Sequence, residues 1–167
     1  MNQTGRIEHP IPPLFDAQSR VLILGSFPSV KSREARFFYG HPQKNRFWRL
    51  TARLLGEAEP VSVEEKKAMI LRHHLALWDV IRSCTVTGSL DSSIRDVTPN
   101  DLRVILDNSR VERIFCNGAT AYRLYQRYLF PQTGIAAEKL PSTSPANAAW
   151  SPDRLEQAWA AIIIDSK

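Results

Sequence analysis

The sequence has few of the residues that build metal sites or membrane anchors. Only two of its 167 residues are cysteines, whereas an all-cysteine zinc site or an iron-sulfur cluster needs about four thiolates. No apolar run approaches the roughly 18 residues that span a bilayer, and the first six residues lack the apolar stretch of a signal peptide. We therefore expect no bound metal, no membrane contact and a cytoplasmic protein whose Cys84 and Cys116 are reduced, buried thiols.

Glycine-rich nucleotide-binding loops are also missing. No Gly-x-Gly-x-x-Gly or Walker-type sequence follows the first apolar run, at residues 20–25. A nucleotide-binding regulator is therefore a weaker interpretation, open only on fold class. The chain is 43% hydrophobic and 23% charged, which is ordinary for a globular protein, and its length predicts one domain over residues 1–167.

Positive charge is concentrated in one segment of the chain. The net charge is +5 and the isoelectric point is near 9.5. Residues 31–53 contain seven cations and a single acid, interleaved with aromatic side chains. Cations neutralise phosphates and rings stack on bases, so this composition suits a single-stranded or extruded nucleotide. It is equally typical of a solvated helix face with a buried apolar stripe, and both interpretations stay open here.

Apolar runs and capping residues predict an α/β fold. Buried strands are expected at residues 20–25, 75–81, 111–116 and 135–140. Helices are expected at residues 46–55, 62–73, 100–107 with Asn100 as the cap, about 118–128, and from 152 onward. The Pro-rich first twenty residues should pack across the domain edge, and residues 83–99 should form a long loop. This alternation predicts three layers, α/β/α, around a short, mostly parallel four-stranded central sheet.

The unusual polar residues follow the predicted strands. In a parallel sheet the functional site lies beyond the carboxyl ends of the strands. Here those ends are the loops around Ser26, residues 79–83, Asn117 and Ser142. We therefore expect these loops to form one site.

Three segments carry a resemblance to a known family. They are Gly-Ser-Phe-Pro-Ser at residues 25–29, Tyr-Gly-His-Pro-Gln-Lys-Asn-Arg-Phe-Trp at 39–48, and Leu-Pro-Ser-Thr-Ser-Pro-Ala-Asn at 140–147. Their order and spacing resemble the mismatch-specific uracil and thymine DNA glycosylases. The middle segment is the most specific of the three. The resemblance spans residues 20 to about 150 and implies a uracil-DNA glycosylase-like fold that acts on DNA containing a damaged base.

One departure from that pattern points to a particular branch of the superfamily. Mismatch-type enzymes position the attacking water with an Asn in the first loop, where this sequence has Phe27, a side chain that cannot hydrogen-bond. The hypoxanthine-DNA glycosylase branch also lacks that Asn, and its essential Asn lies in the Asn-Arg-Phe-Trp segment. By position that residue is Asn45, which the resemblance implies to be catalytic. Asn is also a favoured cap for the helix that follows, and the two roles are compatible.

The resemblance and the strand ends together suggest further site residues. We expect the base to be bound by the residues nearest the strand ends and by the aromatic residues before Asn45: Ser26, Phe27, Phe38, Tyr39, Asp79 and Asn117. Tyr39, or alternatively Phe38, should stack on the base. We expect contacts to DNA from Ser29, Lys31, Arg46, Ser142, Thr143, Ser144, Ala146 and Asn147.

Structural roles remain open for several of these residues. Tyr39 and Phe38 could both be core residues, and Asn117 before Gly118 could cap a turn or a helix. Asp79 could equally cap a loop. His41 is an acid-base residue by type, but beside Pro42 it is expected to order the loop instead. Ala146 is smaller than the side chain that related enzymes insert into DNA, which would make insertion by this loop weak.

The expected function is hydrolysis of the N-glycosidic bond of a deaminated base, with hypoxanthine first. No lysine occupies a matching motif position, so the product should be an abasic site rather than a strand break. The chemistry needs no cofactor, and the protein should act on DNA as a monomer without an obligate protein partner. The alternatives are a uracil or G/U mismatch-specific glycosylase and a non-catalytic DNA-binding member of the fold.

Overall fold

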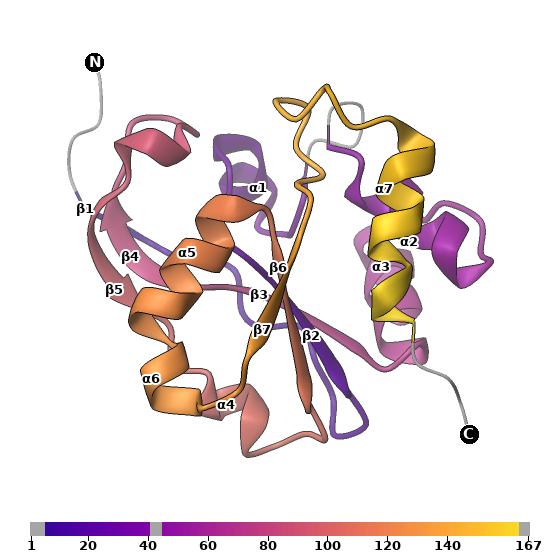
Figure 1. Ribbon diagram of the computed structural model, residues 1–167, viewed down its shortest axis with the longest axis horizontal. Helices are drawn as coiled ribbons and strands as arrows, with labels where there is room; N and C mark the ends of the chain where they lie inside the picture. Colours follow the sequence, from indigo (N-terminus) through magenta and orange to yellow (C-terminus); the bar gives the residue numbers. More distant parts are fainter. Residues whose placement is uncertain (1–5, 41–44, 164–167) are drawn as a thin grey trace.

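The computed structural model describes residues 6–40 and 45–163. Figure 1 shows a twisted sheet through the middle of the protein, with helices on both sides and a smaller sheet at one edge. All structural statements below concern these two ranges. The expectation of one domain over residues 1–167 stays a prediction.

The central sheet has four parallel strands. They lie in the order β3, β2, β6, β7, with bounds Leu75–Asp79, Val21–Gly25, Arg113–Asn117 and Ala137–Leu140. Every residue of β2 and β3 is buried, because their continuous apolar runs are covered on both faces of the sheet. β7 lies at the edge of the sheet, and its two central residues are charged and exposed. The predicted parallel four-stranded sheet is confirmed.

Helices cover both faces of this sheet, which confirms the three-layer arrangement. On one side lie α2 (Phe47–Leu55), α3 (Val63–Arg72) and α7 (Pro152–Trp159), and on the other lie α5 (Ala119–Tyr128) and α6 (Phe130–Thr133) (Figure 1). Two short helices complete the set: α1 (Val30–Ala35), which the sequence analysis did not predict, and α4 (Arg103–Leu106).

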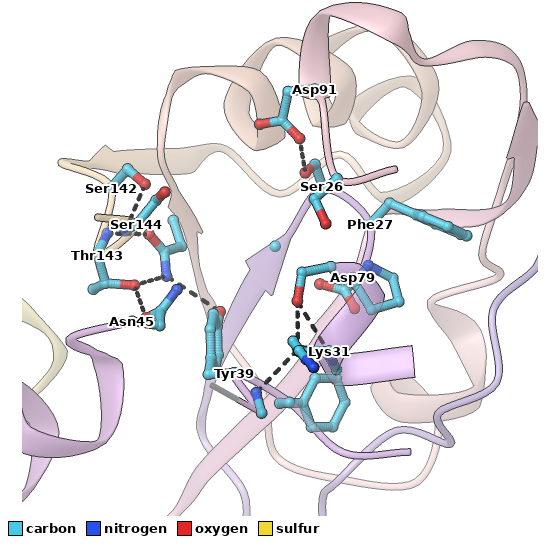
Figure 2. Close-up of a pocket in the computed structure, with 18 of the residues that line it drawn as sticks. Ser26, Phe27, Lys31, Tyr39, Asn45, Asp79, Asp91, Ser142, Thr143 and Ser144 are labelled. Atoms are coloured by element: carbon cyan, nitrogen blue, oxygen red, sulfur yellow. Dashed lines mark hydrogen bonds between the residues drawn. The ribbon is translucent and has the colours of Figure 1, made fainter. Parts of the chain in front are cut away.

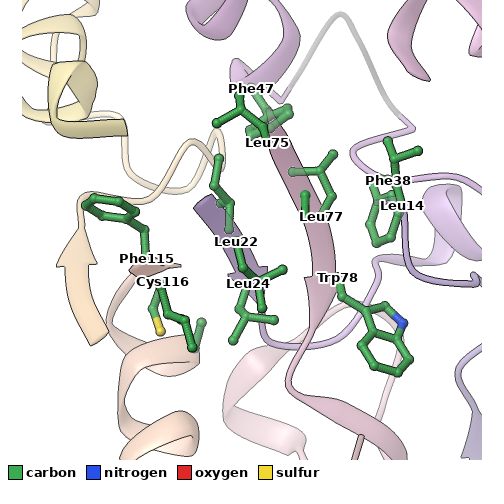
Figure 3. Close-up of a cluster of buried hydrophobic side chains, with 14 of the residues drawn as sticks. Leu14, Leu22, Leu24, Phe38, Phe47, Leu75, Leu77, Trp78, Phe115 and Cys116 are labelled. Carbon is green, nitrogen blue, oxygen red and sulfur yellow. The ribbon is translucent and has the colours of Figure 1, made fainter. Parts of the chain in front are cut away.

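The buried apolar side chains form one cluster around the central sheet. Figure 3 shows leucines of β2 and β3 between aromatic rings contributed by other elements, among them Phe47 from α2 and Phe115 from β6. Leu14 joins them from the Pro-rich lead through a bridge to Leu77. The lead therefore packs against the domain edge as expected, since a buried leucine contributes roughly 1.5–3 kcal/mol when it leaves water.

A second, antiparallel sheet corrects the sequence analysis. It consists of β1 (Arg6–Glu8), β4 (Ile81–Thr85) and β5 (Arg95–Pro99), in the order β1, β4, β5. The expectation that residues 83–99 form a loop is therefore wrong. These strands carry many polar residues because one face of an antiparallel sheet can remain in water. The predicted strand at 75–81 is likewise two strands, which belong to different sheets.

Asn100 does not cap a helix, contrary to the prediction for residues 100–107. Its side-chain amide donates to the carbonyl oxygens of Asp79 and Ile81, at 2.9 and 3.2 Å. Asn100 therefore fixes the bend where the chain leaves the central sheet for the second one. The helix that follows, α4, has only four residues, with Leu102 at its amino-terminal cap.

The register of the parallel strands aligns the residues that end them. Gly25 pairs with Asp79 across β2 and β3, while Leu24 pairs with Cys116 across β2 and β6. Asn117, one residue after Cys116, therefore reaches the same level as Gly25. Parallel pairing thus carries three chain segments to one edge of the sheet, as expected for an α/β fold.

The two cysteines are free and buried, as predicted for reduced thiols. Burial raises the pKa of the Cys116 thiol to about 12, which makes it unreactive as a nucleophile near neutral pH. Among the described residues, no helix is both long enough and apolar enough to cross a membrane.

A surface ion cluster gives the fold a testable pH dependence. The carboxylate of Glu57 accepts hydrogen bonds from Arg72 and His73, and these bonds, Arg72 foremost, lower its pKa from 4.5 to about 2. A lowered pKa stabilises the fold above pH 4.5, and that contribution is lost as pH falls toward 2.

We predict that Glu57→Gln lowers the free energy of unfolding by about 0.5–1 kcal/mol at pH 7. The difference from the wild type should shrink between pH 4.5 and 2, because the wild-type carboxylate becomes protonated there. Urea unfolding at pH 7 and pH 3 measures both values. Glu112→Gln, which breaks the more exposed pair with Arg20, is the control and should change stability less. An equal Glu57→Gln effect at both pH values would contradict this account.

Candidate active site

Loops from all four parallel strands meet around one pocket. Its volume is about 410 Å³, within the roughly 300–1,000 Å³ of typical small-molecule sites. Its lining includes the four residues or loops predicted from the strand ends: Ser26, Asp79, Asn117 and Ser142. The structure therefore brings together segments that are far apart in the sequence (Figure 2).

Asn45 lies at the pocket wall with its side-chain oxygen fully used. Oδ1 accepts from the backbone N–H of Phe47 at 3.0 Å and from the hydroxyl of Thr143 at 2.8 Å. Because a backbone N–H can only donate, the Phe47 bond fixes which end of the amide is oxygen. No described residue accepts from Nδ2. The amide group therefore presents a donor to the pocket, and Asn45 also supports the start of α2.

Thr143 connects Asn45 to the opposite wall. The Thr143 side chain is completely buried, and its hydroxyl accepts from Nδ2 of Asn117 at 3.0 Å while donating to Asn45. The backbone N–H of Thr143 donates to Oδ1 of Asn117 at 3.0 Å. One directed chain of hydrogen bonds from Asn117 through Thr143 to Asn45 thus holds three loops together.

Tyr39 closes this chain and offers a ring to the pocket. Its hydroxyl accepts from Nδ2 of Asn117 at 3.2 Å, and burial, followed by the charge of Asp79, raises the pKa of the phenol. One face of the ring stacks on Phe47 with centroids 4.0 Å apart. Tyr39 also has a φ of 53°, a conformation rare for a residue of this size. The surrounding contacts hold the ring in a fixed position.

Asp79 lies where β3 ends, beside Gly25. Its Oδ2 lies 2.7 Å from Nε2 of His9, and both side chains are almost entirely buried. Its Oδ1 points over Gly25, where a Cβ would come within 2.3 Å of that oxygen. Gly25 is therefore required for space, and Oδ1 accepts no hydrogen bond from a described side chain.

Phe27 and Phe38 make aromatic and apolar contacts, because their side chains have no hydrogen-bonding groups. Phe27 lies between His9, edge-on at 6.0 Å, and the guanidinium of Arg33 at 5.5 Å. Phe38 is 3% exposed and belongs to the core cluster. Both residues line the pocket, so they give it apolar walls. Tyr39 is the better placed of the two rings predicted to stack on a base.

Arg46 points into the protein. Its guanidinium donates to the carbonyl oxygens of Ser144, Asn147 and Trp150 at 2.6–3.2 Å. Its backbone N–H donates to the carbonyl oxygen of Thr143. The side chain therefore orders the loop that follows β7. The cations of residues 31–53 consequently do not form one DNA-facing surface, since Arg49 and Arg53 pair with glutamates.

Of the other residues expected to contact DNA, Ser29, Lys31, Ser142 and Ser144 line the pocket, whereas Ala146 and Asn147 are not among its lining residues. Ser29 caps α1 by accepting from the backbone N–H of Ser32, and the exposed Lys31 is the second residue of that helix. In the loop after β7, the hydroxyls of Ser142 and Ser144 accept from backbone N–H groups within the loop. Asn147 donates to the carbonyl of Ser142, and Ala146 is exposed. His41 lies outside the described residues.

Two titratable residues at the site were missed by the sequence analysis: Asp91, which lines the pocket, and His9, which contacts the lining residue Asp79. His9 stands in the Pro-rich lead, where no pattern marks it as functional. Asp91, in a turn between β4 and β5, accepts from the hydroxyl of Ser26 at 3.2 Å and lines the pocket. Although Asp91 is exposed on its outer side, burial of its carboxyl raises the pKa of that group. Only the missed antiparallel sheet brings Asp91 to the site.

The pocket combines donor, acceptor and aromatic groups. No three His, Cys, Asp or Glu side chains gather as a metal site among the described residues. A donor from Asn45, a free carboxylate oxygen from Asp79 and an aromatic ring from Tyr39 surround a space that one base can enter. Fold and site together define an α/β protein whose pocket offers an aromatic face, a hydrogen-bond donor and an acceptor.

Comparison with known proteins gives the family. A sequence model of the Uracil DNA glycosylase superfamily matches residues 12–163, and the chain belongs to that superfamily. The solution NMR structure of a protein from Methanosarcina acetivorans, described as a candidate uracil DNA glycosylase, superposes with a TM-score of 0.79. It is 33% identical, and the match covers 93% of this chain and 95% of the other.

Two curated relatives carry a more specific name. The hypoxanthine DNA glycosylase of Methanosarcina acetivorans is 34% identical over 157 residues, which cover 93% of this chain and 98% of the relative. The hypoxanthine DNA glycosylase of Methanosarcina barkeri is 33% identical over 97 residues, 58% of this chain and 61% of that protein. The predicted resemblance is thereby confirmed.

The buried hydroxyl of Thr143 gives a test of the site's construction. We predict that Thr143→Val lowers the free energy of unfolding by about 1–3 kcal/mol, because it removes the two hydrogen bonds that the buried hydroxyl makes with the side chains of Asn45 and Asn117. Thr143→Ser keeps the hydroxyl and should lose much less. Urea unfolding compares the two variants. Equal losses would mean that the methyl group, rather than the hydrogen-bond chain, stabilises this loop.

Proposed function

We propose that this protein is a DNA glycosylase that hydrolyses the N-glycosidic bond of a deaminated base, with hypoxanthine as the preferred substrate. Membership in the superfamily and the names of its two curated relatives support the reaction class and the base. We further propose that it acts as a monomer in the cytoplasm and leaves an abasic site. The observation that carries the mechanism is the fixed orientation of the Asn45 amide at the pocket wall.

The reaction needs a positioned water molecule more than a strong base. Cleavage of the bond passes through an oxocarbenium-like sugar, so the enzyme gains most from placing water and stabilising charge. Because Oδ1 of Asn45 already accepts two hydrogen bonds, Nδ2 is the atom left for catalysis. A donor to the water oxygen holds that water while leaving a lone pair to attack the sugar.

The remaining walls suit an extruded purine. A base must leave the duplex before a pocket can enclose it, and the Tyr39 ring, supported from behind by Phe47, supplies a stacking surface. Oδ1 of Asp79 can accept a hydrogen bond from an N–H on the edge of the base. Lys31 and the hydroxyls of the loop after β7 lie at the mouth, where the phosphates of the flanking nucleotides would pass.

Asn45 provides the direct test. We predict that Asn45→Ala and Asn45→Asp each reduce hypoxanthine excision by about 10²-fold or more, a loss typical of removing one preorganised catalytic donor. Asn45→Asp is the sharper variant, because it keeps an oxygen for Phe47 and Thr143 and replaces the donor Nδ2 by a charged acceptor oxygen. The measurement uses excess protein on labelled duplexes with one hypoxanthine, followed by alkali to cleave abasic sites.

The same assay separates the alternatives. Parallel duplexes carry uracil opposite guanine, and binding to an undamaged duplex is measured at two salt concentrations. Cleavage of the uracil duplex alone would move the protein to a uracil or mismatch glycosylase. Salt-sensitive binding without any abasic product would make it a non-catalytic DNA-binding member. Full hypoxanthine excision by Asn45→Asp would remove Nδ2 from the mechanism.

A further inference from the structure

A buried pair of side chains joins the pocket to the amino-terminal lead. His9 follows β1, and Asp79 ends β3. Their side chains are 3% and 7% exposed, with Nε2 of His9 at 2.7 Å from Oδ2 of Asp79. Most buried polar contacts simply satisfy both partners, but here the carboxylate also lines the pocket with its other oxygen.

The backbone determines which nitrogen of His9 carries the proton. Nδ1 accepts from the N–H of Ile11 at 3.2 Å, and a backbone N–H can only donate. The proton of the neutral ring therefore lies on Nε2, which donates to Asp79. The ring is held edge-on between Phe27 and Trp78, at interplanar angles of 77° and 85°. His9 is thus a donor of fixed position.

This donor determines what Asp79 presents to the pocket. With Oδ2 held by His9, the carboxylate cannot turn, and Oδ1 is aimed across the space that Gly25 leaves open. We infer that His9 is a positioning residue that fixes Asp79 as a hydrogen-bond acceptor, so that the pocket selects bases with a proton on the ring nitrogen of their pairing edge. The inference rests on the proposed function and extends it to the choice of base.

The chemistry of deamination explains why such an acceptor discriminates. Adenine has an unprotonated N1, whereas its deamination product hypoxanthine carries N1–H. Cytosine and uracil differ at N3 in the same way. A fixed acceptor receives a hydrogen bond from the N–H of the deaminated base. With adenine or cytosine it faces the lone pair of the ring nitrogen and remains desolvated without a partner. Sites built to bond a substrate N–H reject analogues that lack it by as much as about 10⁴-fold.

Replacement of His9 tests this role. His9→Phe keeps a ring against Phe27 and Trp78 but removes both nitrogens, and His9→Gln restores a donor near the position of Nε2. We expect His9→Phe to lower single-turnover excision of hypoxanthine about tenfold or more, and His9→Gln to recover most of that rate. Affinity for an undamaged duplex should stay unchanged. Rates are expressed per folded molecule, with the folded fraction taken from thermal melting.

A double-substitution cycle shows whether His9 acts through Asp79. If it does, the loss caused by His9→Phe should disappear when Asp79 is already alanine. The matched control is His73→Phe, which breaks the other histidine-carboxylate pair, with Glu57, on the protein surface. That variant should leave excision unchanged. If His9→Phe does not fold, His9→Gln and Asp79→Asn still test the acceptor, since Asp79→Asn alone should narrow the preference for hypoxanthine over adenine.

The outcomes separate this inference from the proposed function. A wild-type protein that excises hypoxanthine, together with a His9→Phe variant of equal rate, would overturn the positioning role and leave the proposed function intact. A His9→Phe loss that persists in the Asp79→Ala background would also overturn it, because His9 would then act by another route. A wild-type protein without excision activity would overturn both.

Discussion

The buried hydroxyl of Thr143 holds the pocket in its observed form. It lies between the amides of Asn45 and Asn117, accepting from one and donating to the other. The three residues come from loops that parallel pairing alone would bring only near one another. The backbone N–H groups of Phe47 and Thr143 donate to the side-chain oxygens of Asn45 and Asn117, and so fix the direction of both amides. The donor that Asn45 presents to the pocket follows from these hydrogen bonds. Arg46 reinforces this arrangement by ordering the loop that contains Thr143.

Much of this architecture could be predicted from the sequence. The continuous apolar runs of β2 and β3 require cover on both faces, and cover on both faces implies a parallel sheet between helices. Strand ends in such a sheet meet at one edge, and the sequence alone therefore predicts Asp79 and Asn117 at the site. Recognition of Asn45 needed more than periodicity, because an Asn before a helix is an ordinary cap; the neighbouring motif made the difference.

The polar parts of the fold could not be predicted in the same way. Arg82, Arg95 and Asp96 of β4 and β5 are exposed, and Asp96 has a positive φ, so the segment has the composition of a loop. His9 and Asp91 were missed for this reason, since the second sheet brings Asp91 to the pocket and His9 to the carboxylate of Asp79. The inward direction of Arg46 depends on carbonyl groups about a hundred residues away, a long-range contact that local sequence does not encode.

The contact between Gly25 and Asp79 limits how this site can evolve. A Cβ at position 25 would lie 2.3 Å from Oδ1, whereas the backbone of Gly25 needs no unusual conformation. Alanine is therefore excluded by its neighbour alone. Any lineage that replaces the glycine must first shorten or remove the carboxylate, because the reverse order passes through a protein with a displaced Asp79. A change at position 25 therefore depends on an earlier change at position 79.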